Sequence, residues 1–248
     1  MPHDTRLIMG MPVSVSVADI TATDDDLEAA FDHFVKADLR FSPFRPDSEL
    51  SRLNRAEISL NECSRQMLDI LDLAETTRID SDGYFDIRRP DGMLDPCGIV
   101  KGWAIREAVL ELTRRGMRNF FVDAGGDIQA LGKNGNGKDW RVGIRNPFHA
   151  DEIVKVLIPR NAGIATSGNY LRGAHIYNPH APDAPPSGIS SLTVIGPDIL
   201  EADRFATAAF AMGETGISFI ERVQGLEGYQ IDAQGRACMT SGLERYLS

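Results

Sequence analysis

The chain has 248 residues, of which 42% are hydrophobic and 25% are charged, and its formal net charge at pH 7 is −10. This composition is typical of a globular protein, and the negative charge disfavours a nucleic-acid backbone or an anionic membrane surface as a partner. A membrane-spanning helix needs a run of about 18 or more apolar residues, and the sequence contains no such run, so we expect no membrane span.

The three cysteines, Cys63, Cys97 and Cys238, are scattered and have no CxxC spacing. This pattern indicates neither a disulfide framework nor a zinc site. The first six residues contain no apolar segment of the kind found in signal peptides. We therefore expect a reducing compartment and predict that the protein is cytoplasmic.

The first half of the chain predicts an alternating strand over Val13–Val17, followed by three amphipathic helices. The Asp24–Asp26 cluster can cap the first helix, and Ser64 can cap the second. The third is expected to begin near Gly98 and to stop at the cationic turn before Gly116. The expected apolar faces are, in chain order, Leu27, Phe31, Phe34 and Val35; Met67, Leu68, Leu71 and Ala74; and Val100, Ala104, Ala108 and Leu112.

The second half of the chain reads mainly as strands. Asn134–Gly137 is a strong hairpin signal between two of them, and the proline-rich segment 179–188 predicts a loop. A helical stretch is expected over residues 215–223 and a terminal hairpin around Gln234–Gly235. Because helices and strands mix without strict βαβ alternation, we expect one α+β domain over residues 1–248, with an antiparallel sheet and packed helices. The candidate strands are Asn119–Val122, Ile128–Leu131, Trp140–Ile144, Ile153–Ile158 and Leu192–Ile195.

The segment Glu201–Phe210 is the most informative, because it predicts a helix after a buried strand and a turn. Asp203 and Thr207 are four residues apart, so their oxygens lie on one face of that helix. Most other positions are Ala or Phe. A carboxylate and a hydroxyl on an otherwise apolar helix need a partner, and Mg²⁺ is a suitable one. The alternative is an aspartate paired with an arginine and a threonine bonded back to its own backbone.

Three further segments carry polar or glycine patterns that suit a phosphate ligand. Gly98 lets the backbone approach a ligand at a helix N-terminus, where Lys101 adds positive charge. The pair Gly125–Gly126 permits positive φ or close packing against a cofactor, and the alternative is a tight turn capped by Asp127. The hydroxyls and amides of residues 166–168 can bind phosphate oxygens. His175 follows, as a candidate base or a group that steers a nucleophile.

Taken in order, these segments resemble the FAD:protein FMN transferase family, the ApbE-like flavin transferases. The resemblance runs from about Met9 to about Gly213. The motifs that carry it are Met9–Val17, Phe41–Asn54, Gly83–Ile87, Asp95–Ala104, Val122–Ile128, Ala165–Tyr170 with His175–Pro179, and Glu201–Phe210.

The resemblance implies a Mg²⁺-dependent reaction in which a Thr or Ser hydroxyl of an acceptor protein takes the FMN moiety of FAD and AMP leaves. It implies that the carbonyl of Gly98 joins Asp203 and Thr207 as a metal ligand, with Asp203 and His175 as the catalytic residues. The residues that the resemblance and the residue chemistry together assign to FAD are Met9, Phe44, Tyr84, Phe85, Asp86, Lys101, Gly125, Gly126, Asp127, Thr166 and Ser167.

The chain also departs from the family pattern. Asn178 stands where the family usually has Asp, Phe44 replaces a usual Tyr, and the segment between Asp86 and Asp95 is shorter than usual. The metal half of the site therefore follows the family more closely than the flavin half. Three alternatives stay open: an FAD pyrophosphatase that forms FMN and AMP, an FAD-binding protein without turnover, and a structural α+β scaffold.

Overall fold

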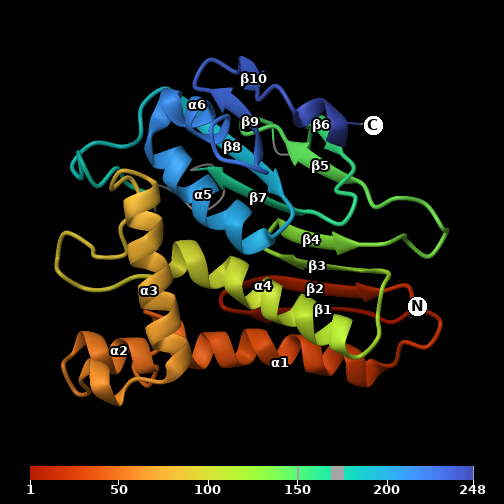
Figure 1. Ribbon diagram of the computed structural model, residues 1–248, viewed down its shortest axis with the longest axis horizontal. Coiled ribbons are helices and arrows are strands. Elements are labelled where there is room, and N and C mark those ends of the chain that lie inside the picture. The colour runs from red at the N-terminus through yellow and green to blue at the C-terminus, as the bar shows by residue number, and fades with distance from the viewer. Residues whose placement is uncertain (150, 169–175, 248) are drawn as a thin grey trace.

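The computed structural model describes residues 1–149, 151–168 and 176–247. Its main feature is a sheet of eight strands in the order β1-β2-β3-β4-β7-β8-β9-β10, in which each neighbouring pair is antiparallel (Figure 1). The strands are β1 (His3–Ile8), β2 (Met11–Val17), β3 (Phe120–Ala124), β4 (Asp127–Leu131), β7 (Gly163–Gly168), β8 (Ile189–Gly196), β9 (Glu227–Asp232) and β10 (Ala237–Met239).

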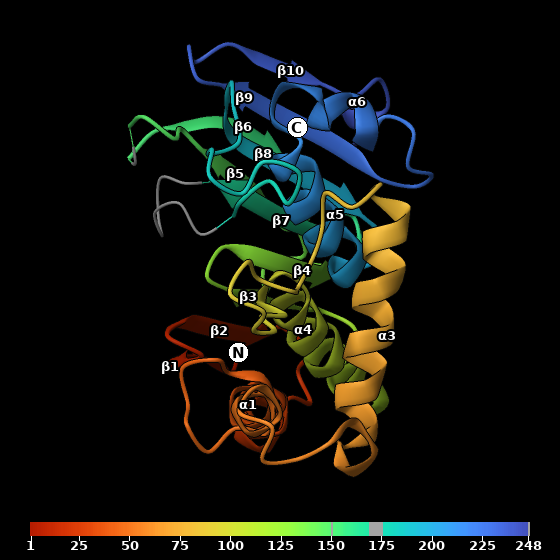
Figure 2. The same cartoon turned by 90° about the vertical axis from the view of Figure 1, so that its left-hand side faces the viewer.

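The helices gather on one face of this sheet, as Figures 1 and 2 show. The prediction of an α+β fold with an antiparallel sheet and packed helices is therefore confirmed. The helices are α1 (Asp24–Phe41), α2 (Glu49–Asn54), α3 (Arg65–Asp80), α4 (Cys97–Arg114), α5 (Ile199–Ala211) and α6 (Gly216–Ile220), with short 3₁₀ turns at Leu60–Glu62, Gly213–Thr215 and Leu243–Tyr246.

Local sequence signals account for most element boundaries. Helix α1 begins after Thr23, whose side chain forms a capping box with Asp26, and α3 begins after Ser64, whose hydroxyl accepts the N–H of Met67. Helix α4 ends at Arg114, as expected, and Gly116 follows with a positive φ of 92°. In β2 the side chains of residues 13, 15 and 17 are buried, which confirms the predicted alternating strand.

Two of the expected helical faces are partly wrong. Val35 is 42% exposed, because the buried stripe of α1 runs through residues 27, 31 and 34 at helical spacing and position 35 lies off it. On α3, Ile70 is buried, whereas Leu68 and Leu71 are only half-buried. The third face is as predicted, since all four of its apolar residues are buried.

The Asn134–Gly137 turn does not join two strands of one hairpin, which corrects the prediction. A single bridge at Lys133 and Asp139 flanks the turn, and β4 then takes β7 as its neighbour in the sheet. The strand after the turn, β5 (Val142–Arg145), pairs instead with β6 (Ile153–Leu157) in a separate sheet. A turn signal predicts only that the chain reverses direction locally. Which strand then pairs with the free edge of β4 depends on the burial of the competing strands.

The remaining predictions for the second half hold. Strand β8 contains the expected Leu192–Ile195, and β9 and β10 form the expected hairpin. The helical stretch expected over 215–223 is present but ends at Ile220, and residues 221–223 form a turn. The segment 179–188 forms no helix or strand. No helix among the described residues is both long enough and apolar enough to cross a bilayer.

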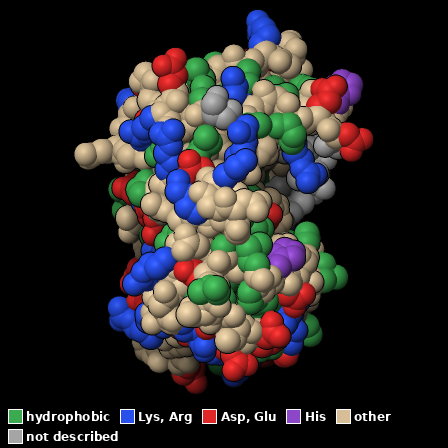
Figure 3. All heavy atoms as spheres, turned by 90° about the vertical axis from the view of Figure 1, so that its right-hand side faces the viewer, with side chains coloured by type: hydrophobic (Ala, Val, Ile, Leu, Met, Phe, Trp, Pro, Cys, Tyr) green, Lys and Arg blue, Asp and Glu red, His purple; other side chains and the backbone are tan. Residues whose placement is uncertain are grey.

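The sheet has a core on each face. The larger core lies under the helices, and a smaller one lies between the strands β7 to β9 and the β5–β6 pair. Strands β4 and β7 share only two register pairs, so the sheet is joined weakly at this point. In Figure 1, α5 lies on the β7–β8 side of that junction and α4 on the β3–β4 side, and the two helices are in contact. On the side of the molecule shown in Figure 3, acidic and basic side chains are interspersed.

Candidate functional site

The site is built at the crossing of α4 and α5. Gly98 and Gly102 lie one turn apart on α4 and face Thr207 and Asp203, which lie one turn apart on α5. A Cβ on Gly102 would lie 2.9 Å from the Cβ of Asp203, and a Cβ on Gly98 would lie 3.1 Å from the Cγ2 of Thr207. The two glycines therefore allow the carboxylate and the hydroxyl to touch the backbone of α4.

Asp203 is buried, at 2% exposure. Its Oδ2 accepts the backbone N–H of Gly102 at 2.8 Å, and its Oδ1 lies 3.6 Å from the Nζ of Lys101. Burial raises the pKa of Asp203 to about 7, against the opposing effect of the Lys101 ammonium, and the nearby Asp127 carboxylate raises it further. The negative charge of Asp203 is therefore under-compensated by these neighbours, and a divalent cation would stabilise it.

The hydroxyl of Thr207 makes no side-chain hydrogen bond to any of the described residues. Other helical threonines behave differently: the hydroxyls of Thr76, Thr77 and Thr113 each donate to the carbonyl four residues earlier. Asp203 also has no arginine partner in the described part of the chain, since Arg204 pairs with other carboxylates. The alternative interpretation of this helix, an aspartate paired with an arginine and a threonine bonded to its own backbone, is therefore not observed among the described residues.

The carbonyl of Gly98 is the third oxygen at the crossing. In an α-helix the N–H of residue 102 donates to the carbonyl of residue 98. In this structure the N–H of Gly102 donates to Oδ2 of Asp203 at 2.8 Å, and a carbonyl oxygen has two lone pairs, so the carbonyl of Gly98 keeps capacity for another partner.

The three oxygens of Gly98, Asp203 and Thr207 fit a hard cation. Carbonyl, carboxylate and hydroxyl oxygens are the donors that Mg²⁺ accepts, and a single carboxylate leaves coordination positions for water and phosphate. The described residues contain no group of three or more His, Cys, Asp or Glu that could hold a metal. A site of this composition lacks such a cluster because two of its donors are neutral. The metal-ligand assignment remains a prediction.

Lys101 connects the crossing to the sheet. Its Nζ forms a close ion pair with Asp127 of β4, which is 1% exposed. The Oδ1 of Asp127 accepts the backbone N–H of Thr166 at 2.9 Å, and the Thr166 hydroxyl is hydrogen-bonded to the Thr193 hydroxyl at 2.8 Å. Asp127 thus ties α4 to strand β7 at the junction between β4 and β7.

The Gly125–Gly126 pair forms the tight turn between β3 and β4. Both glycines have positive φ, 62° and 98°, which the absence of a Cβ permits. The carboxylate that accepts the N–H of Gly126 belongs to Asp123, at 2.8 Å, and not to Asp127. The alternative reading was therefore right about the turn and wrong about the capping residue.

A cavity of about 370 Å³ opens beside the crossing. Most of the residues predicted for the site line it, although they come from separate parts of the chain. The predicted residues on its wall are Phe44, Tyr84, Phe85, Asp86, Gly98, Lys101, Gly125, Thr166, Ser167, Asp203 and Thr207.

Four predicted residues are not on that wall. Met9 is in the turn between β1 and β2, has a φ of 54° and packs against the core. Gly126 and Asp127 lie next to wall residues without lining the cavity. His175 lies outside the described residues, so its predicted role stays a prediction, as do the ligand roles of the other residues.

The cavity also has wall residues that the sequence reading did not select. Tyr177 donates its hydroxyl to the carbonyls of Asp86 and Arg88 at 3.3 and 3.2 Å. It thereby fixes the segment that carries the predicted flavin contacts. Its position just behind the His175 motif was the available signal. The other additional wall residues are Arg89, Asp95, Cys97, Ile176, Pro179 and Ala211, and Gly168 of the predicted 166–168 segment also lines the cavity.

One part of the wall is aromatic. Phe85 is 4% exposed and packs beside Gly98, whereas Phe44 is 88% exposed. Tyr84 meets the ring of His180 edge-on, with 4.6 Å between ring centroids, and the Nε2 of His180 lies 2.9 Å from the carbonyl of Asp82. Such faces suit a flat ring system.

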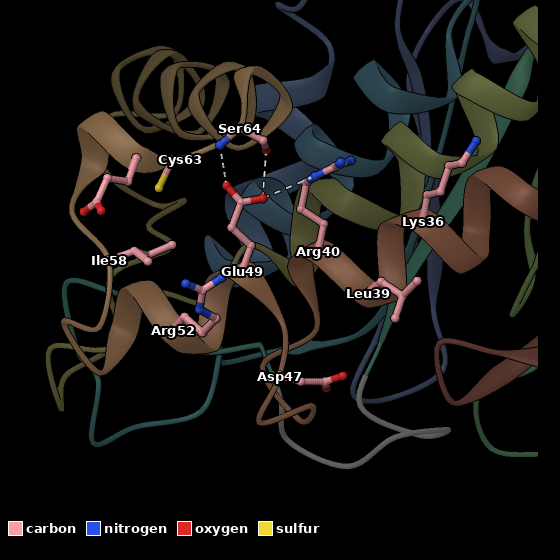
Figure 4. Close-up of a pocket in the computed structure, with 10 residues that line it drawn as sticks. Lys36, Leu39, Arg40, Asp47, Glu49, Arg52, Ile58, Cys63 and Ser64 are labelled. Atoms are coloured by element: carbon pink, nitrogen blue, oxygen red, sulfur yellow. Dashed lines mark hydrogen bonds and ion pairs between the residues drawn. The ribbon is translucent and has the colours of Figure 1, made fainter.

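A second hollow lies between α1, α2 and α3 (Figure 4). Its volume is about 660 Å³, larger than that of the first cavity. Its central carboxylate, Glu49, is already bound by the N–H and the hydroxyl of Ser64 and lies 3.3 Å from the Nε of Arg40. Because this carboxylate needs no further cation, we place the candidate site in the smaller cavity.

The fold and this cavity define an α+β protein with an oxygen-rich candidate ligand site between two helices. The family model described as "ApbE family" matches residues 9–89 and 87–230, so the chain belongs to the ApbE family. The FAD:protein FMN transferase of Klebsiella pneumoniae (strain 342) is 31% identical over 160 residues, covering 61% of this chain and 46% of that protein. The FAD:protein FMN transferase of Escherichia coli (strain K12) is 24% identical over 254 residues, covering 96% and 71%.

Solved structures show the same fold. The flavin transferase ApbE from Vibrio cholerae superposes with a TM-score of 0.86 at 22% identity and covers 99% of both chains. The apo form of the flavinyl transferase ApbE from Pseudomonas stutzeri also gives 0.86, at 20% identity, covering 99% of this chain and 96% of that one.

Proposed function

We propose that this chain transfers the FMN moiety of FAD to a Thr or Ser hydroxyl of an acceptor protein, with Mg²⁺ bound and with release of AMP. The observation that carries the proposal is the α4–α5 crossing, where the buried Asp203 and the Thr207 hydroxyl lie against α4 at the wall of a cavity. The names of the two relatives, FAD:protein FMN transferase, support the choice of substrate.

Asp203, Thr207 and the carbonyl of Gly98 would hold the metal. When bound, Mg²⁺ would neutralise negative charge on the diphosphate and polarise the phosphorus that is attacked. The burial of Asp203 makes this pairing stronger than it would be in water. The neutral donors would leave the bound ion with positive charge to share with the substrate.

FAD would occupy the 370 Å³ cavity, which falls within the roughly 300–1,000 Å³ typical of small-molecule sites. The rings of Tyr84 and Phe85 would pack against its flat ring systems. The hydroxyls of Thr166 and Ser167 and the backbone at Gly125 would bind phosphate oxygens. Lys101, which already faces Asp203, would balance charge on the diphosphate.

The chemistry is a phosphoryl-type transfer. The acceptor hydroxyl oxygen attacks the phosphorus of the FMN half, a phosphoester bond forms, and the bond from that phosphorus to the bridging oxygen breaks. AMP leaves with the bridging oxygen. We assign the removal of the hydroxyl proton to His175. The chain's own contribution is to position the two oxygens in line and to hold charge near them.

The test is AMP release from FAD by the purified protein, measured by chromatography with Mg²⁺ and with EDTA. We expect metal-dependent AMP, with flavin covalently bound to an acceptor when one is present and free FMN when water takes its place. Asp203→Asn should lower the rate of release by on the order of 10²–10³-fold. Glu201→Gln is the matched control, because Glu201 is on the same helix and pairs with Arg204.

The outcomes separate the alternatives. Metal-dependent AMP with only free FMN, even when acceptor protein is present, would favour an FAD pyrophosphatase. FAD binding without AMP under all conditions would favour a flavin-binding protein. If the protein neither bound FAD nor released AMP, the proposal would be overturned.

A further inference from the structure

Lys101 lies between two buried carboxylates and is shared between them unequally. The side chains of Lys101, Asp127 and Asp203 are 15%, 2% and 3% exposed. The ammonium forms a close ion pair with Asp127, while it lies 3.6 Å from Oδ1 of Asp203, beyond hydrogen-bond distance. The asymmetry matters because the two carboxylates have different tasks in the proposed function.

Oδ1 is the oxygen of Asp203 that remains open to a metal. Oδ2 is bound by the N–H of Gly102 at 2.8 Å, whereas no backbone N–H is seen to bind Oδ1 within the described residues. The Lys101 ammonium lies 3.6 Å from Oδ1, and the carboxylate of Asp127 also lies close to that of Asp203. An ammonium bonded directly to Oδ1 would occupy the same place as a divalent cation and repel it. The distance between Lys101 and Asp203 therefore affects metal affinity.

Asp127 is held in place by the sheet. Its Oδ1 accepts the N–H of Thr166 at 2.9 Å, and Thr166 is hydrogen-bonded in turn to Thr193 of β8. This leaves Oδ2 aimed at Lys101. A fixed carboxylate on β4 thus holds a flexible side chain that starts on α4.

We propose that Asp127 is a positioning residue, which retains the ammonium of Lys101 and so keeps Oδ1 of Asp203 available to a divalent cation. The inference rests on the metal site of the proposed function and adds a role for a carboxylate that does not line the cavity. The charges agree with it: Asp127 and Lys101 offset each other, so the ionised form of Asp203 supplies the negative charge that the metal would stabilise.

The test is a double-mutant cycle on metal binding, measured by calorimetry with Mg²⁺ and with Mn²⁺ on the protein without FAD. Asp127→Asn keeps an Oδ1 to accept the N–H of Thr166 and removes the ion pair. The released ammonium should then bind Asp203 and weaken metal binding about tenfold or more. In the Lys101→Met background the same Asp127→Asn change should alter the affinity by less than about threefold.

Asp123→Asn is the matched control. Asp123 is a second carboxylate near the site, and its Oδ1 is bound to the N–H of Gly126. An Asn at 123 keeps that acceptor and removes one negative charge. If loss of charge alone explained the effect of Asp127→Asn, Asp123→Asn should weaken metal binding to a similar degree. We expect a clearly smaller change.

Two results would overturn the inference alone. One is an equal loss from Asp127→Asn with and without Lys101, which would indicate simple charge subtraction. The other result comes from Lys101→Met and is available even if Asp127→Asn does not fold. This variant lacks the competing ammonium, so it should bind the metal at least as tightly as the wild type. A loss of metal binding in Lys101→Met would contradict the inference. If the wild type bound no metal, or Asp203→Asn bound it equally well, the metal site itself would fail as well.

Discussion

The two hollows of this molecule differ in how their charged groups are satisfied. The groove between α1, α2 and α3 is the larger, at about 660 Å³, and its carboxylate Glu49 is bound by Ser64 and Arg40. The cavity at the α4–α5 crossing is smaller, at about 370 Å³. There, Asp203 is buried with one backbone N–H and one shared ammonium.

The difference shows that volume alone does not locate chemistry. The Glu49 carboxylate, whose side chain is 17% exposed, has little to gain from a ligand, since the N–H and hydroxyl of Ser64 and the guanidinium of Arg40 already stabilise its charge. A buried carboxylate with incomplete partners gains much from a cation. The groove therefore has a structural explanation, whereas the incompletely compensated carboxylate at the crossing supports the proposed metal site there.

The largest expected effect is on catalytic activity, which should depend on Asp203 at the crossing and not on Glu49 in the groove. Asp203→Asn should lower kcat for AMP release from FAD by on the order of 10²–10³-fold, because it removes the charged metal ligand next to the diphosphate. Glu49→Gln in the groove should leave kcat within about twofold, as expected for a change outside a catalytic site. A steady-state assay on both variants measures this directly. Equal losses would mean that the comparison of the hollows is mistaken.

The next effect concerns the close approach of the helices. Gly102→Ala places a methyl group 2.9 Å from the Cβ of Asp203 and 3.0 Å from the Cα of Leu200. We expect the free energy of unfolding to fall by about 1–3 kcal/mol through overpacking. At a helix position with open space, Gly→Ala would instead stabilise by roughly 0.5–1 kcal/mol. Urea denaturation measures the change in the free energy of unfolding. A decrease would show that α4 and α5 are in close contact at Gly102, and an increase would show that there is open space.

Much of this site could be predicted from the sequence. The spacing of Asp203 and Thr207 fixes their shared helix face, and the turn expected before Glu201 is where the helix begins, with Asp198 as its N-cap. Gly98 was also identifiable, because a glycine at a helix start permits close approach. These are local properties, and local patterns specify them well.

Other features depend on contacts between distant segments. The role of Gly102 could not be predicted, because its reason is Asp203, 101 residues away in the sequence. For the same reason the contacts of Asp127 with Lys101 and Thr166 could not be predicted, and its assignment to the ligand stays a prediction. The hairpin predicted at Asn134 was wrong because the competing edge partner, β7, comes later in the chain.

A smaller effect is expected in the groove, on stability and not on activity. Glu49→Ala removes the partner of the Ser64 N–H and hydroxyl at the start of α3. We expect a loss of about 1–2 kcal/mol in the free energy of unfolding, measured by urea denaturation, as for other helix-cap bonds. Arg52 lines the same groove, and Arg52→Ala serves as the control. We expect it to change the free energy of unfolding by no more than about 0.5 kcal/mol. A loss of FAD turnover in Glu49→Ala without a loss of stability would contradict this reading.

The smallest expected effect lies at the 88% exposed Phe44 on the cavity wall. Such an exposed ring contributes little to folding, so Phe44→Ala should leave the free energy of unfolding within about 0.5 kcal/mol. A ring stacked on the flavin would be worth about 0.5–1.5 kcal/mol, which corresponds to roughly two- to tenfold weaker FAD binding. Fluorescence titration with FAD measures it, and Phe44→Tyr, which keeps the ring, should restore the affinity. Unchanged FAD binding in Phe44→Ala would remove Phe44 from the flavin site and leave the metal half of the crossing unaffected.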